Sequence, residues 1–272
     1  MPSQTLTFQA MLEGCSRRDI ASWRYFSSKY GSLTEHLLTK RFGDTGSSFF
    51  SLLPEFFSSL SEHENVFLKD FSGSEEREFL IPFQSRLFDF ARSHVKSVHP
   101  PGMSLTSLRE ALGRFPLAHQ EAGWLALKGY VDEVIGKVLR VPVSLVKTGR
   151  VEVLKGFSAC TDSGTGMWRL NDPLLSEVEK CGGPNCPETK AFCKVMDGQM
   201  PWQDKRNIEQ HIAQCLYCLD RETSLKEATF HQRNLPPLSE EVAQSLLSHI
   251  TFAKSATVSQ KSILEKVLKV FR

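Results

Sequence analysis

The sequence predicts an all-α protein built from two small helical domains, a small helical metal-binding domain and C-terminal helices. Over residues 7–96, apolar side chains recur at three- and four-residue spacing, as in Trp23, Phe26 and Tyr30. The same spacing returns over residues 105–157 and in the C-terminal part of the chain. Because residues three and four apart share one helical face, this spacing favours helices that bury one side.

Helix-breaking residues divide the N-terminal half into two predicted domains. A helical bundle is expected over residues 1–98, and it ends in the segment SVHPPGMS, whose two prolines and one glycine break helices. A second, smaller helical domain follows over residues 105–157, where Gly129 and Pro142 separate short helices.

The C-terminal half is expected to contain a linker, a third small domain and an extension. Residues 158–185 are rich in Gly, Ser, Asp, Asn and Pro, which predicts a linker and not a packed element. The metal-binding domain is predicted over residues 186–222. Residues 223–272 form the extension, with helices expected at Ser239–Lys254 and Val258–Phe271.

Composition and charge indicate a cytoplasmic protein. The 272 residues include 33 basic and 31 acidic residues, interspersed along the chain, so no basic arm or acidic block is present. The N-terminus lacks a basic start followed by an apolar run, and no stretch approaches the ~18 apolar residues that cross a bilayer. Most of the cysteines lie between Cys181 and Cys218, which favours a local metal site in a reducing compartment over dispersed disulfides. We therefore expect no membrane contact.

A histidine and two cysteines near residue 215 predict a structural zinc site. His211, Cys215 and Cys218 have the spacing i, i+4 and i+7, so a single helix over Trp202–Glu222 would place all three on one face. Zinc takes four tetrahedral nitrogen and sulfur ligands, so a fourth ligand must come from a neighbouring element. The upstream candidates are Cys181, Cys186 and Cys193.

A turn before the histidine segment would bring one of these cysteines into reach. Asp197 and Gly198 favour a turn, and Pro201 suits the start of the next helix, so residues 186–196 are expected to fold back on it. A closed set of three cysteines and one histidine leaves no position for water, which disfavours a catalytic zinc.

Residues 131–157 have the pattern of a helix-turn-helix. A first helix is predicted over Val131–Leu139, then a turn through Arg140 and Val141, and a second helix entered at Pro142. The second helix would be the one that reads DNA.

Two resemblances give these predictions a functional meaning. The segment CPETKAFCKVMDGQMPWQDKRNIEQHIAQCLYC resembles the zinc-binding anti-sigma domain of bacteria, in which an early Cys or His, a DG turn and an HxxxCxxC motif follow in order. This resemblance implies Cys186 as the fourth zinc ligand, with Cys193 as the alternative.

Residues 108–157 look like region 4 of an extracytoplasmic-function (ECF) sigma factor. The residues in matching places are Leu112, Pro116, Gly129, Glu133, Ile135, Leu139, Val141, Pro142, Val146 and Lys147. Residues 7–96 resemble region 2 of the same factors, through Trp23, Tyr30, Gly43, Asp44, Glu55, Phe57, Phe83, Leu87, Phe88, Ala91 and Arg92. By resemblance, the chain would bind core RNA polymerase and promoter DNA.

The resemblance also assigns individual roles. Polymerase binding would involve Glu55 and Phe56. DNA binding would involve Arg92 in the region 2-like part and four residues of the predicted reader helix, Ser144, Lys147, Arg150 and Lys155.

The leading functional hypothesis is an ECF-type sigma factor with a fused zinc-binding anti-sigma-like domain. That domain would restrain the sigma-like half through an intramolecular contact, or would dock a separate regulator. The alternative is a degenerate sigma-like module that no longer binds DNA and titrates a partner transcription factor. The reader helix carries few cations, and Ser47, Ser48, Phe49, Phe50 and Ser51 stand where region 2 normally has acidic residues. No Gly-rich phosphate loop, Ser/His/Asp grouping or supported carboxylate pair is present, so an enzyme is not expected.

Overall fold

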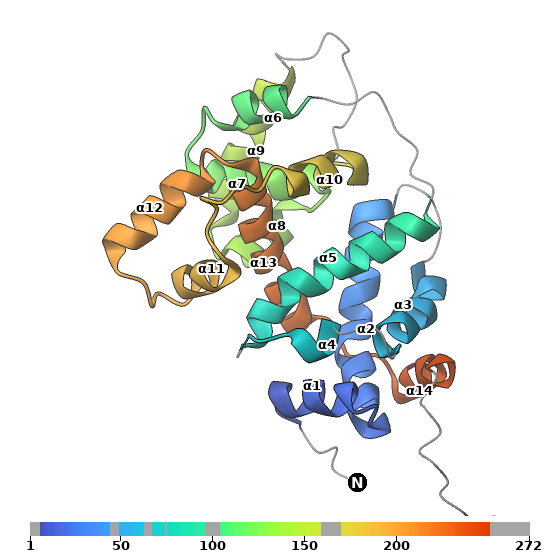
Figure 1. Cartoon of the computed structure of the whole chain (residues 1–272). Helices are drawn as coiled ribbons and strands as arrows, with labels where there is room; N and C mark the ends of the chain where they lie inside the picture. Colours follow the sequence, from blue (N-terminus) through green and yellow to red (C-terminus); the bar gives the residue numbers. More distant parts are fainter. Residues whose placement is uncertain are drawn as a thin grey trace, which may run out of the picture. The chain divides into compact units, whose positions relative to one another are not determined.

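The computed structural model describes residues 6–43, 49–62, 67–73, 75–95, 104–158 and 170–250, and these residues form helices and their connections without any strand (Figure 1). The all-α prediction is confirmed. The N-terminal helices are α1 (Phe8–Ser16), α2 (Ile20–Phe42), α3 (Leu53–Ser61), α4 (Phe67–Asp70) and α5 (Glu76–His94), with a 3₁₀ turn at Phe49–Leu52. The middle helices are α6 (Leu105–Leu112), α7 (Leu117–Leu127), α8 (Asp132–Leu139) and α9 (Val143–Ser158). The last are α10 (Asp172–Lys180), α11 (Thr189–Met196), α12 (Trp202–Ile212), α13 (Leu216–Asn234) and α14 (Glu240–His249).

Several helices begin where a hydroxyl or amide side chain satisfies a free backbone N–H of the first turn. In each case the side-chain oxygen accepts a hydrogen bond from the N–H three residues further on. The capping residues are Thr7 for α1, Ser104 for α6, Asn171 for α10 and Ser239 for α14. The helix predicted over Ser239–Lys254 is therefore present as α14, whereas the helix predicted over Val258–Phe271 lies outside the described residues.

The chain divides into two compact units that differ from the predicted domains. The first combines residues 1–32, 50–72 and 237–272. Among its described residues, Trp23, Phe26 and Phe57 are fully buried, and the Trp23 indole donates to the Cys15 carbonyl at 3.0 Å. α14 packs against α3, so the C-terminal extension contributes to this core.

The second unit comprises residues 33–49 and 73–236. Its central element is α13, which packs against α5, α7, α8, α10 and α12. Phe79, Phe83, Trp124 and Ile135 are fully buried in this unit. α13 also runs through residue 222, where the sequence predicted a boundary between the metal-binding domain and the extension.

The linker predicted over residues 158–185 is wrong for residues 172–180, which form α10. Asn171 caps this helix and Pro173 lies in its first turn, where a missing N–H costs nothing. Leu175 and Val178, three residues apart, are buried, and α10 packs against α13. The polar composition of residues 158–185 as a whole obscured the apolar spacing of Leu175 and Val178. Residues 159–169 of the predicted linker, and residues 97–103 of the predicted boundary, lie outside the described residues.

The predicted helix-turn-helix is confirmed as α8, a tight turn and α9. Arg140 adopts the left-handed conformation (φ 58°) that ends α8, and the Val141 N–H then donates to the Gly136 carbonyl at 3.0 Å. Gly149 lies where α9 meets α7, and a Cβ added there would stand 3.0 Å from the His119 Cα. The glycine weakens the helix by ~1 kcal/mol relative to alanine, but it permits this close approach.

Candidate metal centre

Four side chains of the second unit converge on one point. One ligand atom from each of Cys186, His211, Cys215 and Cys218 lies within 4.8 Å of the others. The Sγ atoms of Cys186 and Cys215 are 3.9 Å apart. Sulfur atoms at ~2.3 Å from a common tetrahedral centre would be separated by about 3.8 Å. The cluster therefore has the spacing that a metal ion requires.

The histidine supplies a further observation in favour of a metal. Its Nε2 atom is buried and has no hydrogen-bond partner among the described residues. A buried polar atom without a partner is costly, and an ion bound to it is one of the few ways to satisfy it. The residues present thus fit a metal ion that the His211 ring and three thiolates would hold.

The chain turns between the histidine and the first cysteine, so the single helix predicted over Trp202–Glu222 is wrong. α12 ends at Ile212, and Cys215 is an extended residue (φ −123°, ψ 110°) that immediately precedes α13. Residues i and i+7 of one helix are about 10 Å apart along its axis, which exceeds the reach of ligands around one ion. The break between α12 and α13 brings the three side chains together.

The fourth side chain of the cluster, Cys186, comes from the loop between α10 and α11. Gly182 lies against the ring of Tyr217, where a Cβ would stand 2.8 Å from the nearest ring carbon, so glycine lets this loop approach the start of α13. The Gly183 N–H donates to the Cys186 sulfur at 3.3 Å. Burial raises the pKa of the Cys186 thiol, but this N–H, the neighbouring thiols and the Arg221 guanidinium outweigh burial and lower it overall. The loop thus favours the thiolate form that binds metals.

The two other candidate cysteines lie outside the cluster. Cys193 is buried on α11, which packs against α5, and burial raises the pKa of its thiol to about 11. Cys181 is exposed and donates to the Glu177 carbonyl at 3.2 Å. The turn predicted at Asp197 and Gly198 is present, with Gly198 at φ 67°. The structure therefore brings Cys186, and not Cys193, to the other three ligands.

The predicted reader helix presents part of its polar face to solvent. Ser144, Lys147 and Lys155 on α9 are exposed. Arg150 is half-buried and its guanidinium pairs with Asp132 at 2.9 Å. Val151 on the same helix is 47% exposed.

The predicted residues of the region 2-like part lie in different surroundings. Arg92 on α5 pairs with Asp172 at 3.1 Å and with Glu179 at 2.6 Å, both from α10. Glu55 on α3 is exposed, whereas Phe56 is fully buried in the core of the first unit. A Phe56 side chain in this position packs the core and has no surface to offer a partner.

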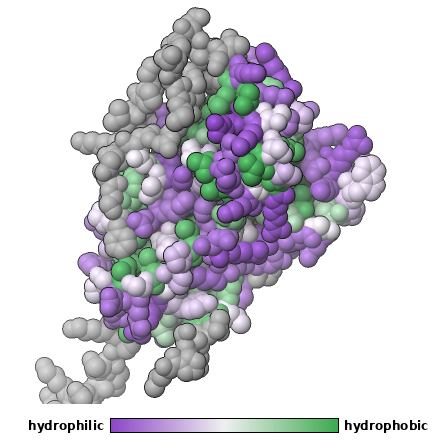
Figure 2. All heavy atoms as spheres, turned by 180° about the vertical axis from the view of Figure 1, so that it is seen from behind, coloured by the Kyte–Doolittle hydropathy of each residue, from purple (hydrophilic) through white to green (hydrophobic). Residues whose placement is uncertain are grey.

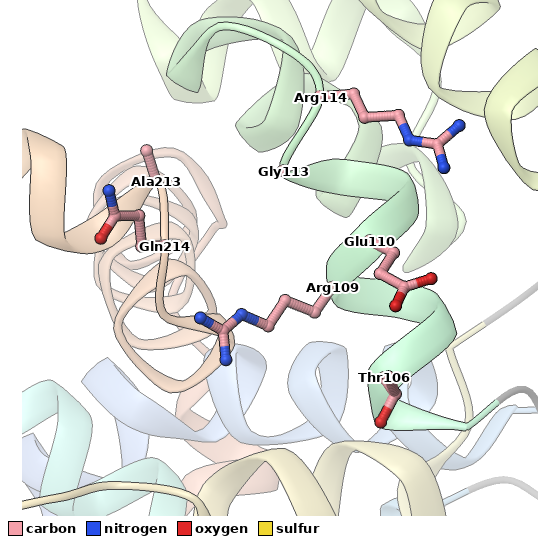
Figure 3. Close-up of a pocket in the computed structure, with 7 residues that line it drawn as sticks. All are labelled: Thr106, Arg109, Glu110, Gly113, Arg114, Ala213 and Gln214. Carbon is pink, nitrogen blue, oxygen red and sulfur yellow. The ribbon is translucent and has the colours of Figure 1, made fainter.

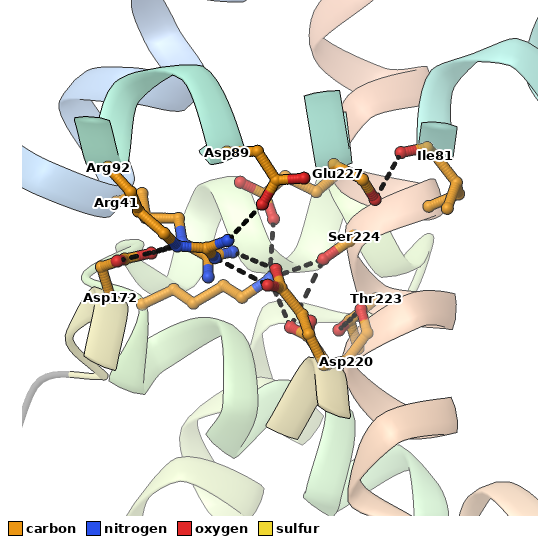
Figure 4. A network of polar contacts seen from close by, with 12 residues as sticks. Arg41, Ile81, Asp89, Arg92, Asp172, Asp220, Thr223, Ser224 and Glu227 are labelled. Atoms are coloured by element: carbon orange, nitrogen blue, oxygen red, sulfur yellow. Dashed lines mark hydrogen bonds and ion pairs between the residues drawn. The ribbon is translucent and has the colours of Figure 1, made fainter. Parts of the chain in front are cut away.

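A buried network of charged residues, which the sequence did not predict, joins α2, α5, α7, α10 and α13 within the second unit (Figure 4). The ammonium of Lys128, the residue that follows α7, lies 2.9 Å from Asp220 and 3.3 Å from Glu227, both on α13. Burial alone would lower the pKa of Lys128, but these two carboxylates hold it above its ordinary value. Arg41 on α2 pairs with Asp172 at 2.5 Å. Lys128 and Asp220 are far apart in sequence, so no local sequence motif could predict this pair.

A hollow of about 540 Å³ lies between α6 and the turn that joins α12 to α13. Figure 3 shows that Arg109 points toward Gln214, whereas Glu110 and Arg114 point away. Since its charged groups diverge, this hollow lacks the converging polar groups that fix a ligand.

No described helix combines the length and the apolar character that a membrane span needs. Among the residues coloured by hydropathy in Figure 2, polar side chains predominate, with small apolar patches between them. No protein-family model, curated protein or solved structure matches the chain.

Proposed function

We propose that this chain is an ECF-type sigma factor whose zinc-binding C-terminal half is its own regulator, acting on RNA polymerase in the cytoplasm. The observation that carries the proposal is the position of α13. This helix begins at the Cys/His cluster and packs against α5 of the region 2-like part and against α7 and α8 of the region 4-like part. A helix with contacts to both parts is suited to restrain both.

The contacts of Arg92 suggest how the C-terminal half would block DNA binding, because its carboxylates occupy the guanidinium that would otherwise contact DNA. By resemblance, this guanidinium would face promoter DNA, but here it binds two carboxylates of α10. Carboxylates and phosphates compete for the same guanidinium donors. In the proposed mechanism, α10 must move away before Arg92 reaches DNA.

Zinc is the metal proposed for the cluster. Three cysteines and one histidine form a closed donor set that zinc adopts in structural sites. Such a zinc would fasten the loop before α11 to the junction of α12 and α13, and so hold α13 in place.

The test is promoter-dependent run-off transcription with purified core polymerase and the full chain, with and without Lys147→Ala. Because α10 occupies Arg92 in the full chain, the proposal predicts a weak promoter-specific product that increases in an Asp172→Asn/Glu179→Gln chain, which frees this guanidinium. The product should decrease when exposed Lys147 is replaced in that chain. The matched control is Lys137→Ala, which removes an exposed cation from α8. Absence of polymerase binding and of promoter-specific transcription in both the full chain and the Asp172→Asn/Glu179→Gln chain would contradict the proposal.

The sparse charge of α9 favours a second candidate, a protein-binding module that titrates a partner transcription factor. Of the three predicted cations, Arg150 is occupied by Asp132, and exposed Val151 suits a protein contact better than a phosphate. DNA affinity falls with salt with a slope close to the number of neutralised phosphates. DNA binding without measurable salt dependence, or no binding at all, together with capture of a purified sigma or anti-sigma factor, would favour this candidate.

A further inference from the structure

Three aromatic rings meet where α13 contacts the Leu33–Phe42 part of α2. The rings of His36 on α2 and His231 on α13 have centroids 3.8 Å apart. Tyr130, from the turn after α7, stacks on His231 with centroids 5.6 Å apart and an interplanar angle of 22°. Two histidines thus lie between three segments of the second unit that are distant in sequence.

The hydrogen bonds at this junction give His36 one acceptor and leave a nitrogen of His231 without one. The Tyr130 hydroxyl donates to Glu227 at 2.5 Å, so it accepts from the His36 Nε2–H at 2.9 Å. His231 is 93% buried, and its Nε2 has no hydrogen-bond partner among the described residues. An imidazolium carries two N–H donors and needs an acceptor for each. The pocket around His231 does not provide both.

The charges near the two rings give little support to added protons. From α2, the Lys40 ammonium lies 4.4 Å from the Tyr130 ring centroid and bonds to the Gly129 carbonyl. On α13 itself, the Glu227 carboxylate favours protonation of the two histidines. However, this carboxylate already accepts a hydrogen bond from Tyr130 and pairs with the Lys128 ammonium. Burial, the His36 ring and Lys40 together lower the pKa of His231 to about 4, against the attraction of Glu227. Burial also lowers the pKa of His36.

Near His231, the carboxylates on the other helices that pack against α13 are already engaged with other groups. Glu76 of α5 accepts a hydrogen bond from Gln232, and α8 contributes apolar residues that pack against Phe230. The α10 carboxylates Asp172 and Glu179 pair with Arg41 and Arg92. α12 meets α13 at the Cys/His cluster, about 20 Å along the helix from His231.

We propose that His36 and His231 form a proton-sensitive latch, whose double protonation in mild acid releases α13 from α2 and from the Tyr130 turn. Two imidazolium rings whose centroids are 3.8 Å apart would repel each other. In the open state both rings face water and recover their ordinary affinity for protons. The latch is a property of the fold and does not depend on the proposed sigma function.

Proton linkage gives the size and the sign of the effect. The closed state keeps the histidines neutral, while the open state binds protons below an ordinary histidine pKa of ~6.5. The open state therefore binds more protons, and the closed state loses stability as pH falls through this value. Each histidine favours opening by about tenfold at pH 5.5, so the pair favours it by about 100-fold relative to pH 7.5.

Hydrogen–deuterium exchange of the full chain at pH 7.5 and 5.5 tests the latch. After correction for the intrinsic pH dependence of exchange, peptides from the C-terminal half of α13 should lose protection by up to about 100-fold. His231→Phe keeps an aromatic ring but cannot be protonated, and His36→Gln keeps a donor for Tyr130. Each variant should reduce the loss about tenfold. His249→Gln, which replaces an exposed histidine at the end of α14, should leave it unchanged.

These variants separate the latch from loss of metal in acid, because both leave the Cys/His cluster intact. If α13 keeps its protection at pH 5.5 in the natural chain, the latch is absent. If both variants lose as much protection as the natural chain, another group causes the opening and the proposal is wrong. Should one variant fail to fold, the other gives the same decision.

Discussion

Lys128 shows how individual residues hold the second unit together. Its ammonium is buried between Asp220 and Glu227, and Asp220 also accepts a hydrogen bond from the Trp124 indole at 2.9 Å. Removal of one partner from a buried ion pair typically costs ~3–5 kcal/mol, because it leaves an uncompensated charge. We expect Lys128→Met to lower the free energy of unfolding by roughly this amount in urea titrations. Lys137→Met, at an exposed position, is the control, and an equal small effect in both would contradict the assigned role.

Glu222 gives a pH-dependent prediction at the same scale. Burial and the nearby Glu121 carboxylate raise the pKa of Glu222 to about 8, against the opposing effect of Lys226. The folded state therefore binds more protons than the unfolded state between about pH 4.5 and pH 8, and stability from this group is lost as pH rises through that window. Glu222→Gln keeps the shape without the charge, so it should be more stable than the natural chain at pH 8, on the order of 2 kcal/mol, and similar at pH 4.5. Urea unfolding at both pH values measures this, with exposed Glu133→Gln as the control. A destabilised glutamine variant at pH 8 would refute it.

Residue roles were predictable from sequence only where spacing carried them. The HxxxCxxC spacing indicated three of the four side chains that the structure brings together, and the resemblance to an anti-sigma domain implied Cys186 as the fourth. The partners of Arg92 and Lys128 were not predictable, because each pair joins residues that only the tertiary fold brings together. The buried position of Phe56 was also missed, since an apolar residue next to an exposed glutamate has the same sequence pattern whether it packs inside or binds a partner.

At the scale of elements, periodicity and turn residues were sufficient for most helices but not for the break between α12 and α13. The boundaries of α8 and α9 follow from Pro142 and the turn before it. The break between α12 and α13 contains no proline or glycine, so local propensity favoured one continuous helix. This break places Cys215 and Cys218 beside His211, which one continuous helix would not do.

Metal removal should therefore loosen the elements around this break. We expect about one zinc ion per chain in protein purified under reducing conditions, and we expect Cys215→Ala to lose it. Structural zinc contributes ~10–16 kcal/mol of apparent binding free energy in small zinc-finger peptides, so its loss should unfold the loop before α11 and the start of α13. Elemental analysis and hydrogen exchange of these peptides measure the two effects.

Cys193→Ala is the control, because this cysteine lies in the same predicted domain, residues 186–222, but outside the cluster. It should retain the metal. If both variants lose the metal equally, Cys193 must be counted among the ligands. If the natural protein contains no metal, the cluster is not a metal site.

At the scale of the whole molecule, the units in the structure combine segments that sequence composition separated. Composition shifts and proline-rich segments suggested a row of domains along the chain. The structure instead groups α13 with α5, α7 and α8 in the second unit, and α14 with α3 in the first. Such long-range packing could not be derived from the sequence, because an amphipathic helix shows which face is buried but not which helix covers it.

This arrangement changes what should follow from truncation at Ser158. A detachable inhibitory module would leave the remaining chain folded and more active. However, α13 supplies Asp220 and Glu227 to Lys128, Asp220 to Trp124, and Glu227 to Tyr130. Without α13 these groups would lose their partners, and the apolar residues of α7 and α8 beneath the helix would meet water.

We therefore expect a chain that ends at Ser158 to unfold at lower urea and with a smaller slope than the full chain, since the slope scales with the surface exposed on unfolding. Tryptophan fluorescence reports the transition through Trp124, which is fully buried in the full chain. Residues 159–272 added as a separate polypeptide should restore the steeper transition if α13 can dock in trans. A truncated chain that unfolds at the same urea concentration as the full chain would mean that α13 contributes little to the core. Regulation by full detachment of the C-terminal half would then become possible. If truncation instead destabilises the chain as expected, release must be partial, and a local movement of α10 away from α5 would free Arg92 while α13 stays in the core.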